Sequence, residues 1–182
     1  VRSSKENYFE LVPRARAVQL EIFARSFDPL SRLISRFASL NLDLAIMEEA
    51  GNDYFAGSGK LRSGFSPIHV DFAPQDSPEW RVGQAEAQLA WNLYLDKGKL
   101  PGDLILWEKM WQPEDDEFQA EGNYYYEEAV VRGVSELRIP ATEGSVVMIN
   151  ARNFHAVSEA KDRLALGSFI SVFADGSFRM FS

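Results

Sequence analysis

After Gly51 the chain consists of short strand-like segments that are separated by turn residues and have no helical pattern between them. We expect strands at residues 67–72, 85–95, 103–109, 125–131, 135–139, 145–149 and 163–173. Many short strands without interleaved helices favour an antiparallel sandwich or barrel. No other feature of the sequence narrows the choice of fold as much.

The beginning of the chain shows a helical pattern instead. Asp28 and Pro29 predict a helix start, because Asp caps free N–H groups and Pro suits the first helical position. Apolar residues then recur at i, i+3, i+4 and i+7. We therefore expect a single domain over residues 1–182, in which a helical support layer at residues 1–50 precedes a β core at residues 51–182.

The composition excludes several kinds of site. The chain has no cysteine, so disulfides, thiolate catalysis and iron–sulfur clusters are ruled out. Its net charge of −8 opposes binding to nucleic acid or to an anionic membrane. No apolar run is long enough to span a bilayer, and no signal peptide is visible. These features predict a cytoplasmic protein.

The chain has only two histidines, and both lie in segments that suit metal binding. His69 and Asp71 are two residues apart, and residues i and i+2 share a face of a strand. His155 is the remaining imidazole, and a double-stranded β-helix can bring such distant strands together. Two histidines and one carboxylate bind one face of a ferrous ion and leave other positions open. Zinc accepts a similar set, but we find no general base beside it for hydrolysis.

An arginine that could bind a carboxylate follows the second histidine in the sequence. Arg163 lies eight residues after His155, at the start of a probable strand, and two small residues share its face. The guanidinium group can hold a carboxylate with two parallel hydrogen bonds in the space that small residues leave. The alternative is an ordinary ion pair with Asp162 or Glu159.

Together these motifs resemble the Fe(II)/2-oxoglutarate-dependent dioxygenase superfamily. The matching pattern is His-x-Asp, a distant His and an Arg several residues beyond it. Residues 88–95 and 100–104 are similar to the strand–turn–strand of prolyl-hydroxylase-type members, and residues 143–149 resemble the strand before the second histidine ligand. The similarity covers residues 60–175.

The resemblance implies a mainly β fold with flanking helices, a double-stranded β-helix (jelly roll, cupin-like) preceded by N-terminal helices. It implies Fe(II), 2-oxoglutarate and O₂, and hydroxylation of an unactivated C–H bond in a small molecule with release of succinate and CO₂. The implied metal ligands are His69, Asp71 and His155. The implied 2-oxoglutarate-binding residues are Arg163, Tyr94 and Asn92.

A closer resemblance is to a bacterial natural-product branch, through residues 8–13, 67–69 and 87–95. That branch includes hydroxylases of N-substituted amino acids and aliphatic halogenases of indole alkaloids. The halogenases have Gly or Ala where this chain has Asp71, so the resemblance implies a hydroxylase. Some members carry a Ser two residues after the arginine, and Ala165 occupies that position here.

Other assignments rest on proximity in the sequence alone. Phe72, Trp107 and Phe154 are candidate substrate contacts, although each could equally belong to the core. Residues 111–117 predict a solvated acidic loop that could act as a lid. Two further functions stay open: a non-catalytic cupin-like module that binds a metal or a carboxylate, and a protein hydroxylase. The sequence does not determine the substrate or the oligomeric state.

Overall fold

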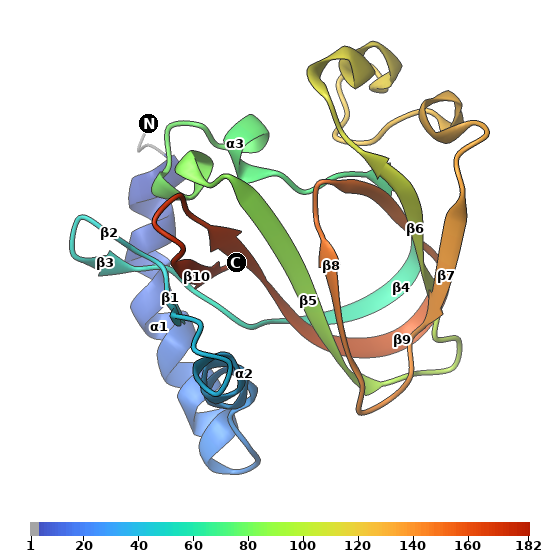
Figure 1. Ribbon diagram of the computed structural model, residues 1–182. Coiled ribbons are helices and arrows are strands. Elements are labelled where there is room, and N and C mark those ends of the chain that lie inside the picture. The colour runs from blue at the N-terminus through green and yellow to red at the C-terminus, as the bar shows by residue number, and fades with distance from the viewer. Residues whose placement is uncertain (1–3) are drawn as a thin grey trace. The chain divides into compact units, whose positions relative to one another are not determined.

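The computed structural model describes residues 4–182, which form two compact units (Figure 1). The first, called here the helical unit, contains the chain up to Ser58 together with residues 73–87 and 168–182. The second, called here the β unit, contains residues 59–72 and 88–167. The organisation of residues 1–182 as a single domain stays a prediction.

Two helices begin the helical unit. Helix α1 spans Ser4–Ala24 and helix α2 spans Pro29–Ala38. The predicted start of α2 is confirmed, because the Asp28 carboxylate accepts hydrogen bonds from the backbone N–H groups of Leu30 and Ser31. The helical part ends at Ala38, so the later residues of the predicted 1–50 layer are not helical. None of the helices among the described residues is both long and apolar enough to cross a bilayer.

Short strands complete the helical unit. Strand β1 (Leu44–Ile46) pairs in parallel with β10 (Phe178–Phe181), and β10 pairs antiparallel with the last residues of β9. Strands β2 (Glu48–Glu49) and β3 (Asn52–Asp53) form a hairpin, and two short helical turns, α3 (Ala73–Asp76) and η1 (Arg81–Gln84), follow later in the chain. The buried core of this unit consists of Met47, Tyr54, Ala73, Val82 and Phe181.

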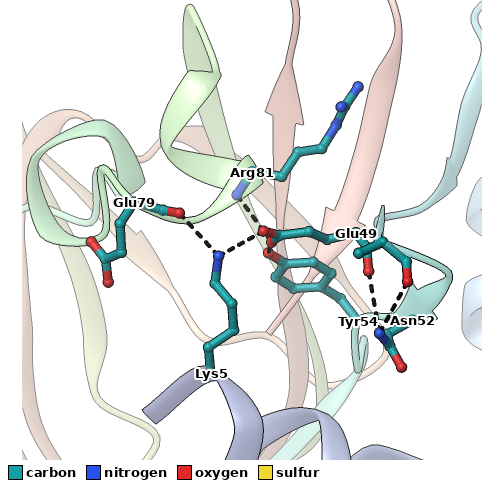
Figure 2. A network of polar contacts seen from close by, with 7 residues as sticks. Lys5, Glu49, Asn52, Tyr54, Glu79 and Arg81 are labelled. Carbon is teal, nitrogen blue, oxygen red and sulfur yellow. Dashed lines mark hydrogen bonds and ion pairs between the residues drawn. The ribbon is translucent and has the colours of Figure 1, made fainter. Parts of the chain in front are cut away.

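A polar network ties these elements together (Figure 2). The Glu49 carboxylate accepts hydrogen bonds from Lys5 Nζ at 2.6 Å, from the Tyr54 hydroxyl and from the Arg81 backbone N–H at 3.1 Å. Lys5 also donates to the Glu79 carbonyl at 3.0 Å. Burial and the adjacent carboxylate raise the pKa of Tyr54. Because its charged and polar groups have partners, the network stabilises the helical unit and needs no ligand.

The β unit is built from six strands that curl round a common interior (Figure 1). The strands are β4 (Ser58–His69), β5 (Ala87–Asp96), β6 (Asp103–Met110), β7 (Glu136–Pro140), β8 (Val146–Asn150) and β9 (Asn153–Val172). Strand β9 pairs with β4, β5 and β6, while β8 pairs antiparallel with β5 and β7 pairs antiparallel with β6. Long β9 therefore lies beside three other strands of the unit.

Most of the predicted strands are present, but β4 runs from Ser58 to His69 rather than over residues 67–72, and the short strands β1, β2 and β3 were not predicted. Strand β9 begins at Asn153 rather than at residue 163, and β10 was not predicted. The segment 125–131 is not a strand: apart from one isolated bridge at Tyr126, it ends in the 3-10 helix η3 (Glu128–Val131). Its β-branched and aromatic residues suit a strand, but here they pack against the sheet, and packing outweighs propensity.

The sheet of the β unit has two distinct faces. In the β6–β9 pairing, Leu106 is opposite His155 and Ile105 is opposite Ala156, so Ala156 lies on the other face from His155. We call the face that carries His155 the inner face. The other face is covered by the segment 111–134 and carries a core of Ile68, Val70, Phe72, Trp107, Trp111, Tyr126, Val130, Val131, Phe154 and Ala156.

The acidic segment 111–117 is more ordered than the predicted solvated loop. It leads into the 3-10 helix η2 (Pro113–Phe118), and both Trp111 and Asp115 are buried. The Asp115 carboxylate forms an ion pair with Lys109 at 2.6 Å and accepts a hydrogen bond from the Gln112 N–H at 2.9 Å. Residues 112–114, 116 and 117 are exposed, as the predicted solvated segment requires, while Asp115 serves as an internal cap. A role as a lid stays a prediction.

Candidate metal centre

The two histidines and Asp71 converge in the β unit, as predicted. His69 is the last residue of β4, Asp71 follows two residues later, and His155 lies near the start of β9. His155 Nε2 is 3.2 Å from Asp71 Oδ2, and His69 Nε2 is 3.9 Å from the same oxygen. The three ligand atoms all lie within 4.8 Å of one another. Metal–ligand bonds of about 2.0–2.2 Å can therefore reach one ion from all three groups after small side-chain adjustments.

Backbone carbonyls orient both imidazoles. His69 Nδ1 is 2.8 Å from the Pro67 carbonyl oxygen, and His155 Nδ1 is 2.9 Å from that of Asn153. An Nδ1–H group that donates to a carbonyl leaves Nε2 unprotonated and directed at the other ligands. The carbonyl acceptors lie two residues before each histidine, a local arrangement that the sequence analysis did not anticipate.

Asp71 is held through its own backbone. Its N–H donates to the Ala151 carbonyl at 3.0 Å, and its carbonyl accepts a hydrogen bond from Gln88 Nε2 at 3.0 Å. Asp71 lies beyond the end of β4 at His69, so strand pairing does not position its carboxylate. These two backbone hydrogen bonds position it instead. Gln88 is buried and is a positioning residue that the sequence analysis missed.

The electrostatics favour the protonation states that a metal needs. Burial lowers the pKa of His69 to about 4, and the adjacent His155 adds to this effect. Burial would raise the pKa of Asp71, but its hydrogen bond with His155 and its electrostatic interaction with both imidazoles hold that pKa below its usual value. A neutral imidazole and an ionised carboxylate are the forms that bind metal.

Arg163 is buried on β9 without a counter-ion. Only 6% of the residue is exposed, and its Nη1 donates to the Pro101 carbonyl at 3.0 Å. Among the described residues no carboxylate pairs with it, so the alternative ion pair with Asp162 or Glu159 is not formed. Its Nε is buried and makes no hydrogen bond. Buried guanidinium groups are almost always paired, so this one is suited to an anionic ligand.

Of the two residues predicted to bind the co-substrate with Arg163, Tyr94 lies next to it and Asn92 lies against Gly167. The Tyr94 ring centre is 5.3 Å from the guanidinium carbon, and Tyr94 is buried against Ala165. Asn92 shares the face of β5 that carries Tyr94, and its Oδ1 would be only 2.6 Å from a Cβ atom at position 167. Gly167 is therefore required by a close approach of β5 and β9.

Solved structures with a similar fold are two forms of an N-substituted L-amino acid dioxygenase from Burkholderia ambifaria, one of them in complex with alpha-KG. Each has a TM-score of 0.66 and covers 97% of this chain. The chain covers 68% and 69% of those two chains, at 16% and 18% identity. This likeness confirms the predicted mainly β fold with N-terminal helices, the double-stranded β-helix.

Two curated proteins are similar in sequence, and no family model matches the chain. An L-gamma-glutamyl-L-propargylglycine hydroxylase from Streptantibioticus cattleyicolor is 27% identical over 139 residues, which cover 72% of this chain and 50% of the hydroxylase. Leucinostatins biosynthesis cluster protein S from Purpureocillium lilacinum is 30% identical over 181 residues, or 93% of this chain and 74% of that protein. The chain belongs to the Fe(II)/2-oxoglutarate-dependent dioxygenases.

Three residues that were predicted to contact the substrate of this dioxygenase do not lie on the inner face of the sheet. Phe72, Trp107 and Phe154 belong to the core on the outer side of the sheet, and Phe154 is completely buried. Phe154 precedes His155 on a strand, so the two side chains point to opposite faces. The alternative interpretation as core residues is therefore the correct one. Closeness to the metal-binding motifs in the sequence did not show on which face of the sheet these side chains lie.

The low pKa of His69 predicts an acid-sensitive metal-free protein. Between pH 6.5 and about 4 the unfolded chain binds a proton at His69 that the folded chain does not, so stability falls as the pH falls through this window. We expect the thermal midpoint to drop from pH 7 to pH 5 in the wild type, and to drop less in His69→Gln. Equal drops in the two proteins would contradict the buried neutral imidazole.

Proposed function

We propose that the chain is an Fe(II)- and 2-oxoglutarate-dependent oxygenase that hydroxylates an unactivated C–H bond of a small molecule in natural-product biosynthesis. The observation that carries this proposal is the convergence of His69, Asp71 and His155 in the same unit as a buried arginine that lacks a counter-ion. A metal site alone would suit many chemistries. The additional guanidinium, Arg163, selects a co-substrate with a carboxylate.

Each residue has a separate part in this proposal. His69, Asp71 and His155 would hold Fe(II) on one face, with two neutral imidazoles and one carboxylate. Arg163 would bind the distal carboxylate of 2-oxoglutarate, with the Tyr94 ring at its side. When bound, the metal supplies the activation of O₂ that couples hydroxylation of the substrate to the conversion of 2-oxoglutarate into succinate and CO₂.

The protein's own contribution is position and exclusion of water. Residues on the inner face orient the two small molecules, and no side chain has to act as a general acid or base. Asp71 occupies the position that halogenases leave free for chloride, which supports hydroxylation over halogenation. The name of one curated relative, an L-gamma-glutamyl-L-propargylglycine hydroxylase, supports an amino-acid-derived metabolite as substrate. A cytoplasmic location stays a prediction.

The test is a spectrum followed by a product assay. Anaerobic addition of Fe(II) and 2-oxoglutarate is expected to produce a weak visible charge-transfer band, which succinate in place of 2-oxoglutarate does not produce. Admission of air is then expected to release succinate slowly even without substrate. A protein that binds Fe(II) but gives neither band nor succinate is a metal-binding module, and the proposal fails.

A further inference from the structure

The turn between strands β8 and β9 presents two backbone carbonyls to two of the metal ligands. The Ala151 carbonyl accepts a hydrogen bond from the Asp71 N–H at 3.0 Å, and the Asn153 carbonyl oxygen is 2.9 Å from Nδ1 of His155. The residue between these two carbonyls is Arg152. A shift of this turn would therefore displace the backbone of Asp71 and reorient the imidazole of His155 at the same time.

Arg152 joins this turn to the segment that follows β6. Its Nε donates to the Trp111 carbonyl at 2.8 Å, and its Nη2 donates to Oε1 of Gln112 at 3.2 Å. The Trp111 N–H donates in return to the Arg152 carbonyl at 2.9 Å. Because both the main chain and the side chain of Arg152 take part, these three hydrogen bonds hold the backbone of the turn as well as the guanidinium group.

Two aromatic rings lie beside the same guanidinium group. Its carbon is 5.0 Å from the centre of the Phe72 ring and 5.7 Å from that of the Trp111 ring. Both rings are buried, and a cation is attracted to the face of an aromatic ring. Phe72 directly follows the ligand Asp71 in the sequence. Arg152 therefore contacts the chain on both sides of Asp71: it contacts the ring of the next residue, and its turn binds the Asp71 N–H.

A second set of contacts holds the turn from strand β5. The Ala151 N–H donates to the Gln88 carbonyl at 2.9 Å, and Gln88 Nε2 donates to the Asp71 carbonyl at 3.0 Å. With the bond from the Asp71 N–H to Ala151, these contacts close a ring of three residues. The position of this ring depends on where the turn lies, and Arg152 ties the turn to Trp111.

We propose that Arg152 is a positioning residue of the metal centre, which sets the placement of Asp71 and His155 by holding the β8–β9 turn. The proposal rests on the proposed function, because it concerns the same metal site. The guanidinium acts through the carbonyls of Ala151 and Asn153 and does not bind the metal itself. Groups that orient metal ligands contribute about 10–100-fold to metal affinity or activity. A residue that only stabilised the fold would leave the metal affinity of the folded protein unchanged.

The affinity of the metal-free protein for Co(II) tests this inference without co-substrate or substrate. Bound Co(II) has a visible absorption spectrum that depends on the geometry of its ligands, so one titration gives both the affinity and the ligand arrangement. Arg152→Met is expected to weaken Co(II) binding by about 10–100-fold and to change the spectrum of the bound ion. Methionine keeps an apolar stem beside the two rings but has no hydrogen-bond donor and no charge.

Arg152→Lys is the conservative variant. Its ammonium keeps the charge beside the two rings but lacks the planar fork that reaches Trp111 and Gln112 together. We therefore expect a loss of Co(II) affinity that is smaller than in Arg152→Met. This variant also answers the question if Arg152→Met does not fold.

Lys109→Met is the matched control. Lys109 binds the same segment, through an ion pair with Asp115 at 2.6 Å, and its Nζ is 5.5 Å from the centre of the Phe154 ring. Among the described residues it makes no hydrogen bond to residues 150–153. Both Lys109→Met and Arg152→Met are expected to lower the thermal midpoint of the metal-free protein. Only Arg152→Met is expected to lose Co(II) affinity, while Lys109→Met changes it less than about 3-fold.

Three results would overturn the inference. The first is a folded Arg152 variant whose Co(II) affinity and spectrum match those of the wild type. The second is an equal loss of affinity in Lys109→Met, which would mean that any loosening of the segment weakens the site. The third is a wild type that binds no Co(II), which leaves no metal centre to position. Failure of the proposed function alone is recognised separately, because the wild type would then bind Co(II) but give neither the Fe(II)–2-oxoglutarate band nor succinate.

Discussion

Asp71→Ala and His155→Ala are each expected to abolish Fe(II) binding and with it all succinate formation. The His155 Nε2–Asp71 Oδ2 distance of 3.2 Å makes the two groups neighbours on one ion, so either deletion leaves a site with only two ligands. Residues that merely orient metal ligands contribute about 10–100-fold to affinity or activity, so the loss of a ligand is expected to exceed about 100-fold. Metal-binding titration and the succinate assay measure both effects.

The ligands are expected to act as a unit. The double variant Asp71→Ala/His155→Ala should therefore be no less active than either single variant. Asp53→Ala, which removes an exposed carboxylate of the helical unit, is the control and should bind Fe(II) normally. Circular dichroism of the metal-free proteins checks that the variants fold. Full activity in a folded Asp71→Ala or His155→Ala protein would remove that residue from the metal centre.

Arg163→Met is expected to raise the KM for 2-oxoglutarate by about 100-fold or more while Fe(II) binding is retained. Removal of one partner from a buried charged pair costs about 2–5 kcal/mol, and each 1.4 kcal/mol is a factor of ten. Arg163→Lys should lose less than Arg163→Met, because the charge remains but the paired hydrogen bonds do not. Arg138→Gln, at an exposed arginine paired with Glu136, is the matched control.

The same variant separates a ligand-binding role from a structural one. Because the guanidinium is buried without a counter-ion, its replacement by Met is not expected to destabilise the metal-free protein. In the wild type, 2-oxoglutarate with Zn(II) should raise the thermal midpoint, and in Arg163→Met this rise should disappear. A large destabilisation of the metal-free variant with unchanged affinity for 2-oxoglutarate would show that Arg163 is a structural residue.

Local patterns predicted a large part of this structure. The Asp28–Pro29 helix start, most of the strands and the closeness of His69 to Asp71 follow from residue types and short spacings. These features depend on capping and on strand periodicity, which act within a few residues. The approach of His155, 84 residues from Asp71, depends instead on pairing between distant strands. Segment 125–131 has the same local signals and is nevertheless not a strand, because its apolar side chains cover the outer face of the sheet.

What the sequence determined by itself is the set of chemical groups and their approximate placement on strands. The chain has two histidines, no cysteine, and an arginine, Arg163, eight residues after the second histidine. These residues leave few ways to bind a metal and a carboxylate. The tertiary structure alone decided which groups share a face and which have partners. Phe154 lies behind the sheet, and Arg163 has no counter-ion. The face on which a side chain lies depends on how distant strands pair and on which segment covers each face. Neither can be read from the spacing of residues along one strand.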